Sequence, residues 1–133
     1  MRFSAICSIS QKAAVEALNG DQTVVAEMVE VFRGRRDHIV ERMRAIPGVT
    51  CRVPDGAFYV FPNMTAFYDR LPEDGSDAHP SVRLSAYLLD QAHAAVVPGI
   101  AFGPGAHIRI SYATRNAELD QRLDGIQQAL ARL

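Results

Sequence analysis

Two hydrophobic periods divide the chain into predicted helices and strands. Apolar residues that recur every three or four positions predict helices over residues 8–19, 21–46, 81–91 and 116–133. Short alternating or continuous apolar runs predict strands within residues 49–53, 57–63, 94–98 and 108–113. The predicted order is therefore helix, helix, strand, strand, helix, strand, strand, helix.

Polar residues and turn formers mark the expected ends of these helices. Ser8 and Gln11 have the Ser-x-x-Gln spacing of a capping box, and Asn116 is expected to cap the last helix. Gly20 and the Pro47-Gly48 pair are expected to end the first two helices.

The apolar stripe of each helix predicts the face that it buries. In the second helix the stripe consists of Val24, Met28, Val31, Phe32, Ile39, Val40, Met43 and Ile46. In the third and fourth helices it consists of Val82, Ser85, Ala86, Leu89 and of Leu119, Leu123, Ile126, Leu130, Leu133. Helices packed on one face of a small mixed sheet would cover these stripes, which predicts a two-layer α/β fold of the α+β kind, with residues 1–133 as one domain.

Composition narrows the function classes. The chain has 133 residues, 48% of them hydrophobic, and a formal net charge of −1. No apolar run is long enough to cross a bilayer, and no basic patch suggests nucleic-acid binding, so a cytoplasmic protein is expected. Cys7, Cys51 and the four histidines have no spacing typical of metal ligands, and no metal is expected.

Arg109 stands out because it lies in the middle of an alternating strand, HIRISYAT at residues 107–114. Alternation places Ile108, Ile110 and Tyr112 on one face, expected to be the core, and Arg109 on the other. Such an arginine either pairs with a nearby acid on an exposed face or is held ready for an anionic ligand. The alternation leaves both open.

Three strand ends and turns, in their order along the chain, resemble a known family. They are GAFYVFPN at 56–63, AVVPGIAFG at 95–103 and HIRISYAT, accompanied by ISQKAAVEALNG at 9–20 and IPGV at 46–49. Together they resemble the carboxy-terminal small domain of class I, fold-type I aminotransferases that use pyridoxal phosphate, most closely the bacterial aspartate aminotransferases. This resemblance covers residues 8–133. It implies transfer of an amino group between an amino acid and a 2-oxo acid, and a homodimeric parent enzyme.

The resemblance also assigns roles to individual residues. Arg109 corresponds to the arginine that binds the substrate α-carboxylate, a task that suits its rigid fork of donors. Phe58 is similar in position to an aromatic residue lining the substrate pocket near the cofactor, with ordinary core packing as the alternative. Pro98 and Gly99 resemble a turn that brings a loop close to the active site, with a purely structural turn as the alternative.

The cofactor machinery of the family is expected to lie outside these residues. Pyridoxal phosphate catalysis needs a lysine, and the sole lysine, Lys12, sits near Glu16 in a setting typical of a surface ion pair. We therefore expect a fragment without catalytic residues or bound cofactor, inactive alone, whose catalytic large domain is missing. The alternatives are a non-catalytic carboxylate-binding or regulatory module, or the small domain of another fold-type I enzyme such as a lyase. The specificity for the amino donor is not predicted.

A missing large domain would leave apolar side chains uncovered. Phe3, Ile6, Phe58 and Phe61 are expected to include residues that face it, and such a patch promotes association.

Overall fold

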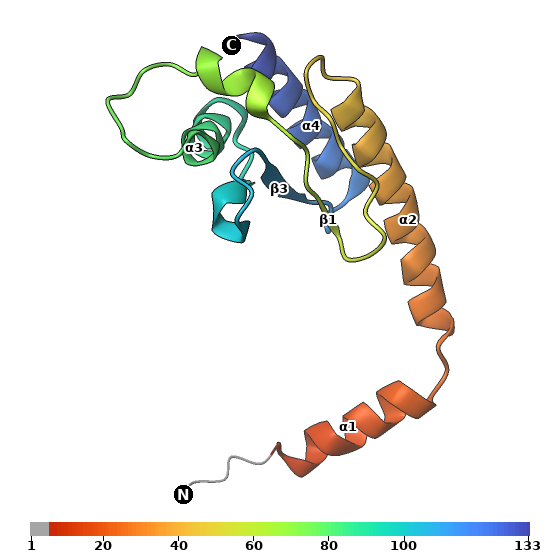
Figure 1. Cartoon of the computed structure of the whole chain (residues 1–133). Coiled ribbons are helices and arrows are strands. Elements are labelled where there is room, and N and C mark those ends of the chain that lie inside the picture. The colour runs from red at the N-terminus through yellow and green to blue at the C-terminus, as the bar shows by residue number, and fades with distance from the viewer. Residues whose placement is uncertain (1–5) are drawn as a thin grey trace, which may run out of the picture. The chain divides into compact units, whose positions relative to one another are not determined.

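The computed structural model describes residues 6–133, which fall into two compact units (Figure 1). Unit 1 ends at Val31, and unit 2 comprises Phe32–Leu133. Within the described residues, no helix is both long and apolar enough to cross a membrane. The elements, in chain order, are α1 (Ser8–Asn19), α2 (Thr23–Arg44), β1 (Tyr59–Val60), the 3₁₀ helix η1 (Thr65–Arg70), α3 (Pro80–Ala92), β2 (Val97–Pro98), the 3₁₀ helix η2 (Gly99–Phe102), β3 (Ile108–Ser111) and α4 (Asn116–Ala131).

The start of α1 differs from the predicted capping box. Ser8 is already the first helical residue, and the residue before it, Cys7, makes no side-chain cap. Gln11 instead donates from Nε2 to the carbonyl of Ile6 over 2.6 Å. A serine inside the helix has its backbone in helical geometry, so it is not placed to cap the first turn. The predicted end is confirmed, because the N–H of Gly20 bonds to the carbonyl of Glu16.

The second predicted helix is confirmed as α2, but only its second half has the predicted buried face. Ile39, Val40 and Met43 are buried in unit 2. Val24 and Met28, which belong to unit 1, are more than half exposed. The apolar stripe therefore predicted the helix correctly. It did not predict burial, because only the part of α2 in unit 2 packs against a core.

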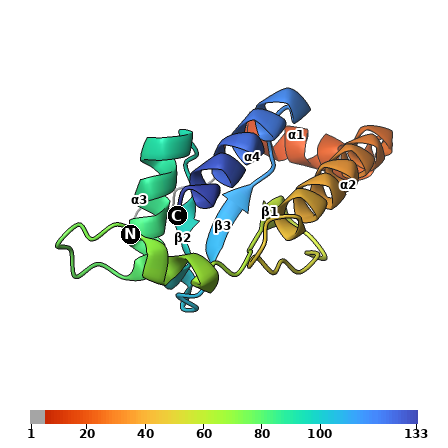
Figure 2. The same cartoon turned by 90° about the horizontal axis from the view of Figure 1, so that it is seen from above.

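The sheet is smaller than predicted and antiparallel. The strand order is β1-β3-β2, with Tyr59 opposite Ser111 and Val97 opposite Arg109 (Figure 2). The two-layer α/β class is confirmed, but the prediction of a mixed sheet is wrong for the described strands. The predicted strand at 49–53 is replaced by a single bridge at Thr50. One reason is that the Cys51 carbonyl accepts a hydrogen bond from Arg44 Nε instead of from a neighbouring strand.

The core lies between one face of this sheet and the helices of unit 2. Ile108, Ile110 and Tyr112 are buried on the predicted face, and the Tyr112 hydroxyl donates to the Ala57 carbonyl over 3.0 Å. The predicted stripe of α4 is confirmed at its buried members, which are Leu119, Leu123, Ile126 and Leu130.

The inner stripe predicted for α3 is wrong by about one position. Val82 and Leu89 are exposed, whereas Leu84 and Leu88 are fully buried. Ser81 is also fully buried, and its hydroxyl is satisfied there: Oγ lies 2.9 Å from His79 Nδ1 and accepts the Ile100 N–H at 3.4 Å. These hydrogen bonds let a polar residue face inward, which a hydrophobic pattern does not reveal.

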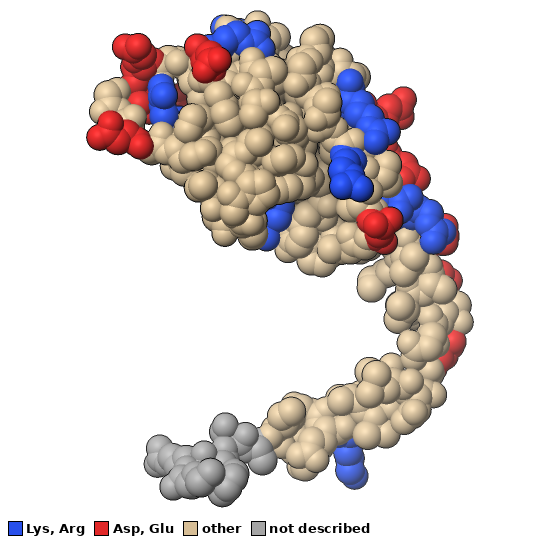
Figure 3. Space-filling view, in the orientation of Figure 1, with Lys and Arg blue, Asp and Glu red and all other residues tan. Residues whose placement is uncertain are grey.

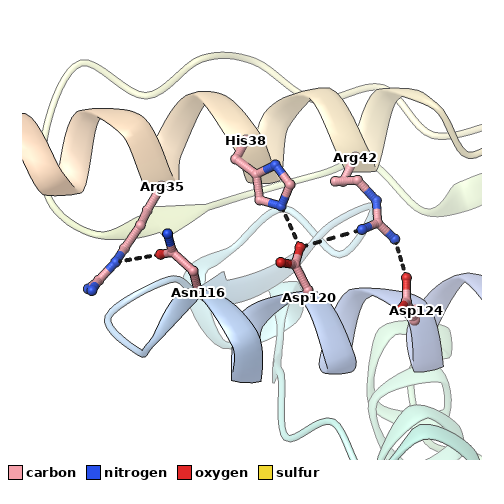
Figure 4. A network of polar contacts seen from close by, with 6 residues as sticks. All are labelled: Arg35, His38, Arg42, Asn116, Asp120 and Asp124. Carbon is pink, nitrogen blue, oxygen red and sulfur yellow. Dashed lines mark hydrogen bonds and ion pairs between the residues drawn. The ribbon is translucent and has the colours of Figure 1, made fainter.

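Hydrogen bonds and ion pairs join α2 to α4 (Figure 4). Asp120 lies 2.5 Å from His38 Nε2 and 3.6 Å from Arg42, which also pairs with Asp124. Asn116 accepts a hydrogen bond from Arg35 and makes no cap for α4, contrary to the prediction. Acidic and basic side chains consequently lie side by side on this surface (Figure 3).

Candidate functional site

Arg109 lies in β3, the middle strand, on the face opposite the core. Its neighbours in sequence, Ile108 and Ile110, are 0% and 6% exposed, whereas Arg109 is half-buried. The predicted alternation is therefore confirmed. Because β3 pairs on both sides, its backbone is fixed by two ladders, and Arg109 leaves the sheet from a rigid position.

Two aromatic rings contact the guanidinium of Arg109. Its Cζ lies 4.4 Å from the centre of the Tyr59 ring and 4.5 Å from that of Phe102. Tyr59 comes from β1, on one side of β3, and Phe102 comes from η2, which directly follows β2 on the other side. Both distances are typical of cation–π contacts, which attract the charge to the ring face.

No acidic side chain among residues 6–133 pairs with this guanidinium. Arg36, Arg42 and Arg83 of unit 2, by contrast, each pair with an aspartate. A ring carries no full negative charge, so the contacts with Tyr59 and Phe102 do not neutralise the guanidinium as a carboxylate would. One interpretation of Arg109 was a surface arginine paired with a nearby acid. The described residues do not form such a pair.

Further aromatic side chains support these two rings. Phe61 meets Phe102 edge-on at 6.0 Å and stacks on the His107 ring at 4.8 Å with an interplanar angle of 7°. Phe58 lies 4.6 Å from the Tyr59 ring. We call Phe58, Tyr59, Phe61, Phe102 and His107 the aromatic cluster. Of its members, Tyr59 and Phe102 contact Arg109 directly.

Phe58 lies at the edge of the aromatic cluster and is partly exposed. It precedes β1, contacts Phe32 and Tyr59, and is 41% exposed, which excludes ordinary core packing. No contact joins Phe58 to Arg109 among the described interactions. The ring that reaches the guanidinium belongs to Tyr59, the next residue, so a substrate-lining role for Phe58 stays a prediction.

The Pro98-Gly99 turn positions the segment that carries Phe102. The Gly99 N–H donates to the His107 carbonyl over 2.8 Å. A Cβ on Gly99 would lie 2.2 Å from that carbonyl oxygen and 2.6 Å from the Pro104 carbonyl oxygen. Only glycine fits here without moving the backbone, and the turn thereby places η2 beside the start of β3.

The surroundings of Lys12 differ from those of a typical Schiff-base lysine. It is exposed on α1, in unit 1, and its neighbours in a shallow hollow are Ser8, Gln11 and Val15 of the same helix. The predicted ion pair with Glu16 does not form among the described residues. A lysine that forms a Schiff base is normally activated by burial or by a neighbouring cation. Lys12 is exposed, and no cation lies beside it in the part of the chain that the structure describes.

The sequence profile described as "Aminotransferase class I and II" matches residues 1–126. The chain belongs to this aminotransferase family. The predicted resemblance is thus confirmed, and with it the expectation that pyridoxal phosphate is the cofactor of complete members.

Several aminotransferases are similar to the chain in sequence. The aspartate aminotransferase of Rhizobium meliloti (strain 1021) is 47% identical over 126 residues, which are 95% of the chain and 31% of the relative. That of Pinus pinaster is 41% identical over 130 residues, 96% of the chain and 26% of the relative. The chain therefore spans between a quarter and a third of the length of these two aminotransferases.

Solved aminotransferase structures share the fold. The crystal structure of the Rhizobium meliloti aspartate aminotransferase has a TM-score of 0.88 at 45% identity, and the match covers 98% of the chain and 33% of that structure. The alanine aminotransferase of Pyrococcus furiosus has a TM-score of 0.77 at 27% identity, covering 91% and 29%.

Proposed function

We propose that the chain is the small domain of an aspartate-type aminotransferase and that Arg109 binds the α-carboxylate of its substrate. The observation that carries this proposal is a guanidinium that has no acidic partner among residues 6–133 and is contacted by Tyr59 and Phe102, on the face of the sheet opposite the core. The parent reaction moves an amino group between an amino acid and a 2-oxo acid, as the family predicts.

The surroundings of Arg109 suit a carboxylate. A guanidinium presents two parallel N–H donors that match two carboxylate oxygens, which fixes the orientation of the ligand as well as its affinity. Half-burial and the apolar rings of Tyr59 and Phe102 reduce screening by water, so the charge acts more strongly than on an open surface. The contribution of this chain is therefore to bind and orient one end of the substrate.

The cofactor chemistry belongs to another part of the enzyme. Pyridoxal phosphate, when bound, supplies the electron sink that amino transfer requires. The residues around Lys12 do not fit it, and we propose that its lysine and its remaining ligands lie in the large domain. Pairing of two such enzymes into a homodimer is part of the same proposal.

The same geometry would serve a carboxylate-binding module that performs no turnover. The exposed setting of Lys12 favours this second function for the chain on its own. The two differ in one respect: only a small domain should restore amino transfer when it is joined to a large domain.

A chimera tests this difference. The segment of the Rhizobium meliloti aspartate aminotransferase that aligns with the chain is replaced by the chain, and transfer from L-aspartate to 2-oxoglutarate is measured. We expect turnover, unchanged by Lys12→Ala, and borohydride reduction should attach the cofactor to a lysine outside the chain. A folded, cofactor-loaded chimera without turnover would favour the binding module, and turnover that requires Lys12 would refute the proposed division of roles.

A further inference from the structure

The aromatic contacts of Arg109 have a function of their own. An arginine side chain has several rotatable bonds, and binding a ligand through it costs the freedom that the side chain still has. The ring of Tyr59 reaches the guanidinium from β1, which flanks β3 on one side, and the ring of Phe102 reaches it from η2, which follows the strand on the other side. They can therefore restrict the guanidinium before any ligand arrives.

We propose that Tyr59 and Phe102 are positioning residues that hold the Arg109 guanidinium in the orientation in which it receives a planar carboxylate. This inference rests on the proposed function, since it concerns the same arginine. It adds two residues from two other elements, neither of which would need to touch the substrate.

Both rings are fixed by the fold. Tyr59 begins β1 and is paired in register with Ser111 of β3. Phe102 ends η2, whose start is tied to β3 by the hydrogen bond from Gly99 to the His107 carbonyl and to α3 by the contact between Ile100 and Ser81. A site supported by rigid elements keeps its geometry better than one held by a free loop.

Rings position this arginine better than an acid would. A carboxylate within the chain would hold the guanidinium through the same N–H donors that a ligand needs, and a ligand would then have to displace it. The rings of Tyr59 and Phe102 attract the guanidinium without an opposite charge, so its charge is not compensated by a carboxylate of its own and a ligand has no acid to displace. The described structure shows this arrangement, with two rings and no ion pair.

Phe61 packs against Phe102, so replacing Phe61 should affect Arg109 only indirectly. Phe61 touches Phe102 but has no contact with Arg109. Its replacement should therefore loosen the guanidinium less than replacement of Phe102 itself.

The test follows the Nε–H resonance of Arg109 by NMR in the full chain, with sodium pyruvate as a one-carboxylate probe at constant ionic strength. The variants are Tyr59→Leu and Phe102→Leu, with Tyr59→Phe and Phe102→Tyr as versions that keep a ring. Arg109→Ala removes the proposed carboxylate donor. Arg70→Ala is the matched control, because Arg70 also lies over a ring, 4.6 Å from the centre of Phe67, but outside this site.

We expect each leucine variant to move the Arg109 resonance away from its ring-shifted position and to weaken pyruvate binding about two- to tenfold. The variants that keep a ring should retain both properties, as should Arg70→Ala. Phe102 is 47% exposed, so Phe102→Leu is expected to fold.

Two results distinguish failure of the positioning role from failure of the carboxylate site itself. If Arg109→Ala abolishes pyruvate binding but both leucine variants bind as the unmodified chain does, the positioning role is overturned and the carboxylate role survives. If Arg109→Ala binds pyruvate as well as the unmodified chain, the proposed carboxylate site itself is overturned.

Discussion

At the scale of single residues, the arginines that lie against rings differ in whether their N–H donors are bonded within the fold. Arg70 stacks on Phe67, but its Nε also donates to the Ala66 carbonyl. Arg35 lies 5.3 Å from the Phe32 ring and donates to Asn116. Their donors are therefore already used within the fold. Arg109 combines two rings with no such bond among the described residues, in keeping with the proposal that it binds a ligand.

The two cysteines should differ in reactivity. Cys7 is exposed, and a hydrogen bond with the Ser10 hydroxyl lowers the pKa of its thiol. Burial raises the pKa of Cys51, although nearby Arg44 opposes this. Because the thiolate is the reactive form, iodoacetamide near pH 8 should modify Cys7 well before Cys51. Mass spectrometry of peptides over time measures both rates, and urea should remove the difference. Equal rates in the folded chain would contradict the buried position of Cys51.

Single-residue patterns predicted the face of Arg109 but not its partners. Alternation within HIRISYAT places Arg109 opposite Ile108 and Ile110, which the structure confirms. The contact with Tyr59 depends on register between two strands, and the contact with Phe102 depends on the path of η2. Neither contact can be predicted from the alternation of apolar and polar residues within one strand, because strand pairing and loop geometry are set by the tertiary structure.

At the scale of elements, the turn before η2 should be the most sensitive to a small substitution. Gly99→Ala brings a Cβ against two backbone carbonyls, which have no room to yield. We expect it to lower the free energy of unfolding by about 1–3 kcal/mol, as overpacking does. Gly56→Ala is the control, because nothing lies within 4 Å of its Cβ, and it should change stability by less than about 0.5 kcal/mol. Urea unfolding of both variants checks this, and equal effects would contradict the account of the turn.

The contact between α2 and α4 should depend on apolar packing more than on its ion pairs. Asp120 and Arg42 are partly exposed, so Asp120→Asn should cost less than about 1 kcal/mol. Leu123 is 2% exposed, and Leu123→Ala should cost about 2–5 kcal/mol through the cavity it leaves. Urea unfolding at low and high salt separates the two contributions. A larger loss for Asp120→Asn than for Leu123→Ala would contradict this assignment.

The helices were more predictable than the strands for a physical reason. A long amphipathic stripe such as that of α4 repeats over several turns, whereas β1 and β2 have two residues each. Short strands carry little periodicity, and side-chain bonds such as that from Arg44 to the Cys51 carbonyl decide locally whether a ladder forms. The 3₁₀ helices η1 and η2 gave no recognisable pattern.

At the scale of the whole molecule, unit 1 has little to cover its apolar side chains. No residue of α1 is buried, and Ile9, Val15 and Leu18 are at least 60% exposed. The part of α1 in view in Figure 3 is mostly uncharged. Of the residues expected to face a large domain, Ile6 is 70% exposed and Phe61 is half-buried, while Phe3 lies outside the described residues.

Such a surface should promote association of the chain on its own. We expect sedimentation velocity to show concentration-dependent association together with binding of a hydrophobic dye, because exposed apolar patches of this kind associate in water. The double variant Ile9→Ser, Leu18→Ser should reduce both. A monomer at all concentrations without dye binding would indicate that this surface needs no partner.

The most direct test of the central claim is the kinetic role of Arg109 in the chimeric aminotransferase. Removing a carboxylate's bidentate partner typically costs about 2–5 kcal/mol, so Arg109→Ala should lower kcat/KM roughly thirtyfold to several-thousandfold. Arg109→Lys should recover only part of this, since an ammonium keeps the charge without the fork. Arg70→Ala should retain kcat/KM, and cofactor absorbance and Tm should be preserved in all three variants. An unchanged kcat/KM for Arg109→Ala in a folded, cofactor-loaded enzyme would contradict the account.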